Sequence, residues 1–358
     1  MIDLFPRAVK SQFGRRDLTG RDHWHTLDID EYRIVKPTII CFGGNGTCDD
    51  PDESEIIPRK SGTQKANSFC RVLESLLGLK IEQKNIYSSY NDIDVLGFSY
   101  GKNSRDSRTG LFSGSDIQKI VDNLLVPLFL DSEGKYLEVS HAAKNFSYIT
   151  FFTHCHGSRE HSRVMGRLFD ELKASSAYSD DEIMTIFAHS FHVSYCPLLE
   201  EVWMPTVRVQ SMGDKFQTGL DEMYFDCYGK VLDGIDVRYD DETTFMGKPV
   251  PEQIRHKYAD KVTIFTSRML NNDKTGEPID EHPVELLARN SDWRIKRDGK
   301  NLDAVSTMVA HALGEHVACS LNNYRNNRLD VPVCVSAKSL MGYFEDIKSG
   351  YSEEELAR

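Results

Sequence analysis

A cysteine between two histidines is the feature of this sequence that could most directly do chemistry. Cys155 lies at the centre of residues 153–158, which read Thr-His-Cys-His-Gly-Ser. The thiolate is the reactive form of a cysteine, so catalysis would require the pKa of this thiol to be lowered. A histidine base and the N-terminus of a helix that begins near Arg159 could both stabilise the thiolate. We therefore interpret Cys155 as a candidate nucleophile.

Two predicted elements must position this cysteine. Residues 146–152 are rich in aromatic and β-branched side chains and predict a strand, and residues 160–174 predict a helix. The few residues between them must form a sharp turn, which strains the backbone of its central residue and tolerates only small neighbours two positions away on either side. Gly157 meets this requirement after the cysteine. Thr153, before it, is larger than the glycine that is usual there.

The same alternation continues along the chain and predicts the fold class. Strands that alternate with helices pair in parallel through right-handed crossovers, so we expect an α/β protein with a doubly wound, mostly parallel sheet and helices on both faces. The further predicted strands cover residues 38–42, 94–100, 183–188, 206–210 and 262–266, and the further predicted helices cover 63–77, 117–125 and 301–321.

The predicted domain organisation follows from where this pattern begins and where it weakens. Residues 1–36 are polar and mixed in charge, and we expect them to form an N-terminal extension packed on the core. Residues 37–358 are predicted to form one α/β domain. Its apolar periodicity weakens over about 219–260, where the charge also rises, which predicts an insertion before the last strand.

The charge and hydropathy of the chain argue against two classes of partner. Acidic residues outnumber basic ones by 55 to 43, and the formal net charge of -12, with no long basic run, argues against nucleic acid. No window approaches the roughly 20 apolar residues that a membrane-spanning helix needs. We therefore expect a soluble protein with no membrane span. The sequence does not indicate an oligomeric state.

The cysteines indicate the compartment. The chain has eight of them and no Cys-x-x-Cys pair, which argues against a disulfide framework and against a structural zinc site. Reduced thiols in a cytoplasm fit best, and because no metal-ligand spacing is visible we expect no metal and no cofactor. The glutamates at 353–355 leave a secreted bacterial effector, acting in a host cytosol, as the alternative localisation.

The turn around the cysteine resembles the nucleophile elbow of the α/β hydrolases, in which a cysteine can replace the serine, as in dienelactone-hydrolase-like enzymes. The resemblance in the order and spacing of elements covers roughly residues 37–290, and it departs from Gly-x-Ser-x-Gly at Thr153 and Cys155. It implies a hydrolase that acts on an ester, thioester or related small acyl substrate. The implied mechanism is a Cys-His-Asp triad with an acyl-enzyme intermediate.

The resemblance also implies where the other two triad residues lie. In the family the acid follows a later strand and the histidine follows the last strand. Asp214 follows the predicted strand 206–210, and His282 follows the predicted strand 262–266. His282 would take the thiol proton and Asp214 would fix its tautomer. A turn aspartate that bonds its own backbone is the alternative reading of Asp214.

Stabilisation of the oxyanion needs two backbone N–H donors, which the family takes from the residue after the nucleophile and from the loop after an earlier strand. The first donor would be His156. The second would come from the loop that begins Gly43, Gly44, Asn45. A glycine-rich loop can also bind phosphate, but the full phosphate-binding pattern is absent here.

Three alternatives stay open at this point. Ser190 also follows an apolar run, but His192 stands where a sharp turn needs glycine. A caspase-like or clostripain-like cysteine peptidase would use a histidine followed by glycine, as in His156-Gly157, and a cysteine at the end of the next strand. Cys196 comes several residues too late for that if the next strand is 183–188. The third alternative is an inactive α/β-hydrolase fold that serves as a binding or regulatory module.

Overall fold

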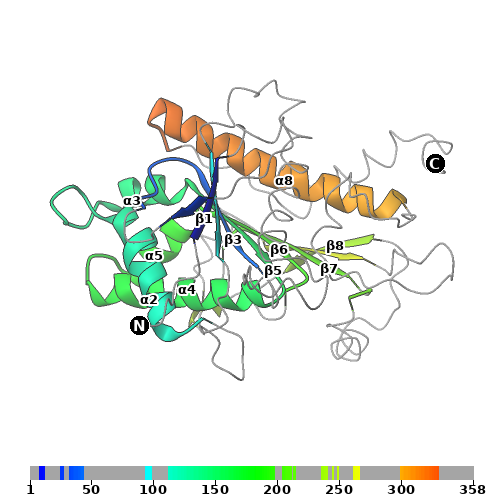
Figure 1. Ribbon diagram of the computed structural model, residues 1–358, viewed down its shortest axis with the longest axis horizontal. Coiled ribbons are helices and arrows are strands. Elements are labelled where there is room, and N and C mark those ends of the chain that lie inside the picture. Colours follow the sequence, from blue (N-terminus) through cyan, green and yellow to red (C-terminus); the bar gives the residue numbers. More distant parts are fainter. Residues whose placement is uncertain are drawn as a thin grey trace.

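The computed structural model describes a central sheet and the helices that cover it (Figure 1). The residues that the structure describes are 8–12, 25–27, 32–43, 93–98, 112–197, 204–211, 213–214, 235–240, 244–245, 248–249, 261–266 and 299–329. The predicted helix 63–77 lies outside these residues.

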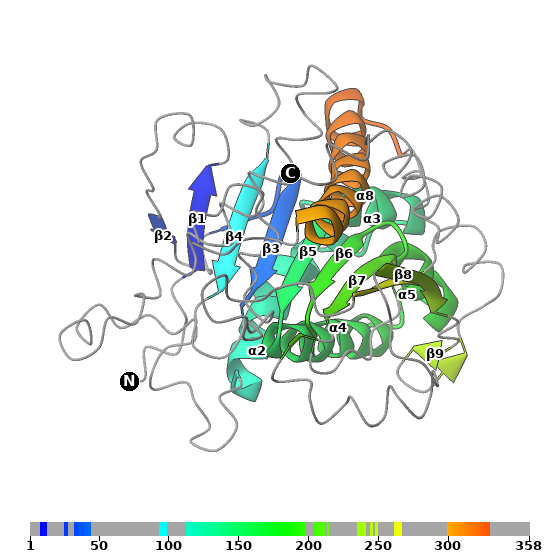
Figure 2. The same ribbon diagram turned by 90° about the vertical axis from the view of Figure 1, so that its right-hand side faces the viewer.

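Within these residues the strands form a nine-stranded sheet of order β2-β1-β4-β3-β5-β6-β7-β11-β8 and a small hairpin of β9 and β10 (Figure 2). The strands are β1 (Ala8–Gln12), β2 (His25–Leu27), β3 (Thr38–Phe42), β4 (Asp94–Phe98), β5 (Ile149–His154), β6 (Phe191–Tyr195), β7 (Thr206–Ser211), β8 (Ile235–Asp240), β9 (Thr244–Phe245), β10 (Lys248–Pro249) and β11 (Lys261–Thr266).

The core of this sheet is parallel. Every neighbouring pair from β4 through β3, β5, β6 and β7 to β11 runs in the same direction. The chain leaves β3 for β4 on one side and then returns to β5 on the other, so the direction of winding reverses between β3 and β5. The carboxyl ends of all these strands meet at one edge. The predicted α/β class is therefore confirmed.

The strands at the two margins are antiparallel to this core. β1 pairs antiparallel with β4 and with β2, and both marginal strands come from the N-terminal residues 1–36. At the other margin β8 pairs antiparallel with β11. Its residues fall inside 219–260, so a part of the segment that was expected to be an insertion belongs to the main sheet.

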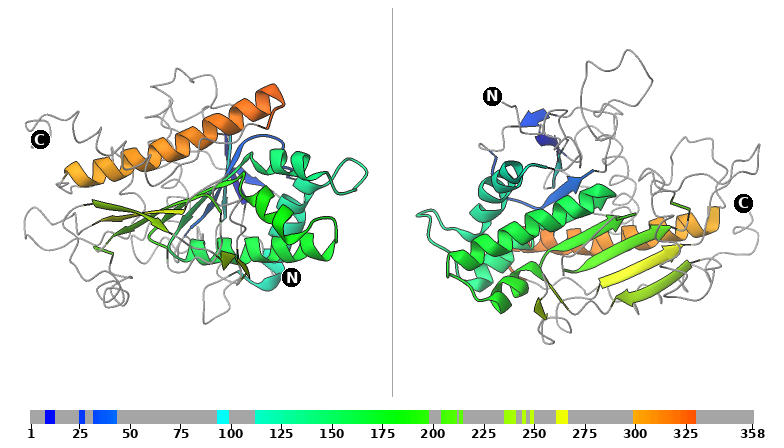
Figure 3. Two further views of the ribbon diagram at one scale, coloured as in Figure 1. Left: turned by 180° about the vertical axis from the view of Figure 1, so that it is seen from behind. Right: turned by 90° about the horizontal axis from the view of Figure 1, so that it is seen from below.

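Helices cover both faces of the sheet (Figures 1 and 3). The long helix α8 contacts β5, β6 and β7 on one face, whereas α4 contacts β5 and β3 on the other, with α2, α3 and α5 beside it. The helices are α2 (Gly114–Ile120), continued by a π-helical turn η4 (Val121–Leu125) and a 3-10 turn η5 (Val126–Phe129), and α3 (Val139–Phe146), α4 (His156–Ala174), α5 (Asp180–Phe187) and α8 (Gly299–Asn326).

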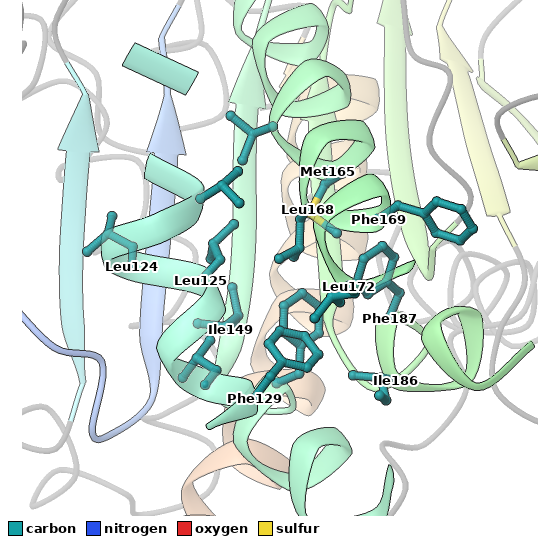
Figure 4. Close-up of a cluster of buried hydrophobic side chains, with 14 of the residues drawn as sticks. Leu124, Leu125, Phe129, Ile149, Met165, Leu168, Phe169, Leu172, Ile186 and Phe187 are labelled. Carbon is teal, nitrogen blue, oxygen red and sulfur yellow. The ribbon is translucent and has the colours of Figure 1, made fainter. Parts of the chain in front are cut away.

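The core on the α4 face explains why these segments are helical. The apolar residues of α4 recur at helical spacing and form one buried stripe that faces the sheet and the neighbouring helices (Figure 4). Phe146 stacks on Phe187 with ring centroids 5.2 Å apart, which joins α3 to α5. The buried stripe of α4 consists of Val164, Met165, Leu168, Phe169 and Leu172.

The core on the α8 face contains a buried histidine. The predicted helix 301–321 is confirmed, and its apolar stripe is buried from Val305 to Leu321. His316 lies in that stripe, 3.3 Å from the carbonyl oxygen of Ile149 in β5, and stacks on Phe191 of β6. Burial lowers the pKa of His316 to about 4, which outweighs the hydrogen bond to that carbonyl.

One predicted element is wrong. Residues 183–188 were predicted to be a strand, but they lie in the helix α5 and its C-terminal cap. Ser179 begins this helix with a capping box to Glu182, so the helix start was visible in the sequence. The strand that follows is β6, and Ser190, directly before it, is buried and donates a hydrogen bond to the carbonyl of Ile149.

No helix among the described residues is long and apolar enough to cross a membrane.

We expect His316 to make the protein sensitive to acid. Because its pKa is lower in the folded state than the ordinary 6.5, the unfolded state takes up the proton first as the pH falls. Stability is therefore lost between about pH 6.5 and pH 4. His316→Gln, which removes the titration, should gain about 2 kcal/mol in unfolding free energy relative to the parent protein between pH 7 and 4.5.

Denaturant unfolding at several pH values measures this difference. The matched control is His141→Gln on the exposed face of α3, which replaces the same residue type away from the buried core. A pH-independent difference for His316→Gln would contradict the interpretation.

Candidate active site

Cys155 occupies a strained turn at the centre of the sheet. β5 ends at His154 and α4 begins at His156, so this one residue makes the whole connection. Its backbone has φ 54° and ψ -125°, a conformation that costs a residue other than glycine about 1–3 kcal/mol. The Cys155 N–H donates to the carbonyl of Tyr195 on β6, and its own carbonyl accepts from Ser158 Oγ at 2.7 Å. The predicted sharp turn is present but shorter than expected, because β5 extends to His154 and α4 begins at His156 instead of near Arg159.

Gly157 is required by the close approach of α4 to β3. A Cβ at position 157 would lie 2.0 Å from the carbonyl oxygen of Phe42 and 2.9 Å from that of Gly43. Such contacts are far inside van der Waals distance, so only glycine lets the helix start directly above the end of β3. The small residue predicted two positions after Cys155 therefore fits a steric requirement that comes from the neighbouring strand.

Of the residues predicted to stabilise the oxyanion, the structure describes His156 and Gly43. His156 is half-buried and is the first residue of α4, so its N–H lies in the N-terminal turn of a 19-residue helix. Gly43 is buried directly after β3, which pairs with β5 up to Thr153. Gly43 and the cysteine are therefore at the ends of adjacent strands. Gly44 and Asn45 lie outside the described residues.

Asp214 is buried at the same edge of the sheet. It follows β7, which lies next to β6 and thus two strands away from β5. Only 1% of Asp214 is exposed, and its N–H donates to the carbonyl of Ser211 at 3.2 Å. This backbone contact closes a turn after β7 and does not involve the Asp214 side chain, whose burial at this edge is compatible with a role as acid.

The side chain of Asp214 meets a second cysteine. Cys196 directly follows β6, is fully buried and has a positive φ of 45°. Its thiol is hydrogen-bonded to the Asp214 carboxyl. Burial, and secondly the charge of Asp214, raise the pKa of the Cys196 thiol well above its usual value, so this thiol stays protonated. This contact was not predicted from the sequence, because the strand before Cys196 was misplaced.

The proposed base, His282, lies outside the described residues. Among the residues that flank Cys155, the His154 ring packs at 6.0 Å from the ring of Tyr195. His316 is held in the α8 core and faces β5 and β6 near their amino ends. The structure therefore joins Cys155, His156, Gly43 and Asp214 at one edge and leaves the histidine a prediction.

A second buried acid lies near the start of α4. Glu160 lies in the second turn of α4, accepts a hydrogen bond from the Phe112 N–H and pairs with Arg163 at 3.0 Å. Burial raises its pKa to about 7, which outweighs the opposing effect of Arg163. The sequence signal for this group was weak, because a glutamate followed by arginine three residues later is common on exposed helix faces.

No group of three or more His, Cys, Asp and Glu side chains among the described residues could hold a metal ion. No protein-family model matches the chain, and no curated protein shows significant sequence similarity to it. A functional proposal therefore rests on the geometry of this edge of the sheet.

Replacement of Gly157 tests the close approach of α4 to β3. We expect Gly157→Ala to lower the unfolding free energy by about 1–3 kcal/mol, the usual cost of overpacking, because backbone atoms must move to admit the methyl group. The matched control is Gly114→Ala at the start of α2, where nothing lies within 4 Å. That variant should be neutral or slightly stabilising. Equal effects in denaturant unfolding would contradict the steric argument.

Glu160→Gln tests the raised pKa. Because the folded pKa of about 7 exceeds the ordinary 4.5, the protonated form of Glu160 favours the folded state. This contribution to stability is fully present below pH 4.5 and is lost as the pH rises through 7. The variant should therefore gain about 2 kcal/mol relative to the parent protein between pH 5 and pH 8. Chemical unfolding at both pH values measures the gain, with Glu133→Gln in an exposed loop as the control. A lower unfolding free energy for the variant than for the parent protein at pH 8 would show that the ion pair of Glu160 with Arg163 outweighs the cost of burying the charge.

Proposed function

We propose that this protein is a hydrolase of small acyl substrates, esters or thioesters, with Cys155 as its nucleophile. The observation that carries the proposal is the backbone of Cys155, held at φ 54° and ψ -125° between β5 and α4. Strain of this kind persists only where the surroundings enforce it, and it is concentrated at functional sites. Gly157 and the end of β3 supply that enforcement here.

An α/β-hydrolase type of fold is part of the proposal. The candidate nucleophile follows β5, the candidate acid Asp214 follows β7, and the candidate base His282 comes after β11 in the chain. That is the chain order of nucleophile, acid and histidine in this class of enzyme. The position of Cys155 agrees with a second rule. In open α/β sheets ligands bind outside the carboxyl ends of the strands where the winding reverses, which here is between β3 and β5.

The proposed reaction has two steps. His282 takes the proton of the Cys155 thiol, the thiolate attacks the carbonyl carbon of the substrate, and the oxygen of that carbonyl takes up the electron pair. The C–O or C–S bond to the leaving group then breaks, and the leaving group receives the proton from His282. In the second step a water molecule, deprotonated by His282, attacks the thioester and releases the acid and the thiol.

The N-terminus of α4 supports both steps. The partial positive charge at a helix N-terminus stabilises a thiolate and a developing oxyanion alike. The His156 N–H is the first donor in the proposal, and the loop beginning at Gly43 supplies the second. Asp214 would orient the His282 ring.

A cysteine peptidase of the caspase-like type is the second candidate, and the position of β6 favours it more than the sequence did. Cys196 directly follows β6, and His156-Gly157 follows the adjacent strand β5. The objection that Cys196 comes too late is therefore removed. However, burial and the charge of Asp214 raise the pKa of the Cys196 thiol, which opposes a role as nucleophile.

Mapping of cysteine reactivity separates these candidates. Limiting iodoacetamide should alkylate Cys155 at least about tenfold faster than the other seven cysteines at pH 7, because an activated thiol is mostly thiolate. Peptide mass spectrometry identifies the modified site. Unfolding should abolish the preference, and Cys196→Ser should keep it.

The other outcomes are equally informative. Preferential alkylation of Cys196, lost in His156→Ala, would support the peptidase. If Cys155 reacts no faster than the other cysteines in the folded protein, it is not an activated nucleophile. A reactive Cys155 without turnover of any ester or thioester in a substrate panel would indicate a binding module.

His282→Ala tests the base. If His282 takes the thiol proton, its removal should slow ester or thioester turnover by about 10²–10⁴-fold and shift the pH midpoint of Cys155 alkylation upwards. His141→Ala on α3 is the matched control and should change neither quantity. A His282→Ala variant with the turnover and pH midpoint of the parent protein would assign the base to another histidine.

A further inference from the structure

Thr153 is the residue at which the turn departs most from a glycine-flanked elbow, and its hydroxyl is held by two polar side chains of β6. Thr153 Oγ1 lies 2.8 Å from Nε2 of His192 and donates to Ser194 Oγ at 3.0 Å. All three residues are fully buried. The Thr153 hydroxyl has one proton, which it donates to Ser194 Oγ. The Thr153 oxygen therefore accepts the Nε2–H of His192. Thr153 is thus fixed by a directed chain of hydrogen bonds.

His192 also lies beside the next strand and packs on the helix above. Its Nδ1 is 3.5 Å from Oγ1 of Thr206 on β7. The His192 ring packs on the ring of His161 from α4, with centroids 4.2 Å apart. His161 also packs on Phe151 of β5 at 4.5 Å.

This arrangement places His192 between the two elements that the turn joins. On one side it binds Thr153, two residues before Cys155 on β5. On the other side it contacts α4 five residues after the helix starts, and the same His161 ring lies 6.2 Å from the ring of Phe42. The carbonyl of Phe42 is the group against which Gly157 is packed. A change at His192 would therefore reach both ends of the strained turn.

We propose that His192 is a positioning residue that holds the end of β5 through the Thr153 hydroxyl and so keeps Cys155 in its strained conformation. The inference rests on the proposed nucleophilic function of Cys155. It explains the threonine in place of glycine. The larger side chain lies beneath the turn, in the interface between the sheet and α4, where its hydroxyl is bonded rather than buried alone.

Two matched pairs of variants test the inference. Thr153→Val removes the hydroxyl at nearly constant shape, whereas Thr153→Ser keeps it. His192→Phe removes both ring nitrogens, whereas the amide of His192→Gln can donate from the position of Nε2. The measured quantity is the rate constant and the pH midpoint of Cys155 alkylation by iodoacetamide in the folded protein, beside the unfolding free energy of each variant.

We expect Thr153→Val and His192→Phe to slow alkylation by roughly tenfold, the effect of losing one buried hydrogen bond, and to shift the pH midpoint. Thr153→Ser and His192→Gln should recover most of the rate. In the double variant the two losses should not add, because both substitutions break the same contact. A residue that only supported the fold would lower the unfolding free energy and leave the alkylation of folded protein unchanged.

Alkylation at the parental rate and pH midpoint in Thr153→Val overturns the inference, whatever that rate is. Should His192→Phe fail to fold, the two threonine variants carry the test by themselves. Failure of the proposed function gives a different result, namely a parent protein in which Cys155 reacts no faster than the other cysteines.

Discussion

The close approach of α4 to the end of β3 is the constraint on which the rest of this structure depends. The helix can begin one residue after β5 only because Gly157 presents no side chain to the Phe42 carbonyl. With the helix seated there, a single residue must reverse the chain, and its backbone is driven to φ 54°. A cysteine on a relaxed loop would not be held in this one backbone conformation.

Hydrogen bonds at both ends of β5 hold the strand that leads into the strained turn. At its amino end the carbonyl of Ile149 accepts hydrogen bonds from Ser190 and from His316 of α8. At its carboxyl end Thr153 is tied to β6, and the Cys155 N–H is bonded to the Tyr195 carbonyl. Buried polar groups are costly unless each is bonded, so these contacts specify one register for the central strand.

The candidate groups at this edge follow four adjacent strands. Gly43 follows β3, Cys155 follows β5, and the thiol after β6 is bonded to the carboxyl after β7. The winding of the chain brings these ends together although they are separated by up to 171 residues, from Gly43 to Asp214. A sheet whose winding reverses at β3 and β5 leaves room there for a ligand, which is the physical basis for a site at this point.

The sequence by itself determined the α/β class, the strand before Cys155 and the helix after it, because these follow from local periodicity. It also predicted a small residue at 157, but the contact that requires glycine there, with the Phe42 carbonyl, is tertiary. It failed at residues 183–188, since a short apolar run fits a buried helix as well as a strand and periodicity cannot separate them. Only the tertiary structure decided that Cys196 ends β6 beside Asp214, and that Thr153 is bound by His192. Those contacts join residues of different strands, and their existence depends on strand order and register, which no local pattern encodes.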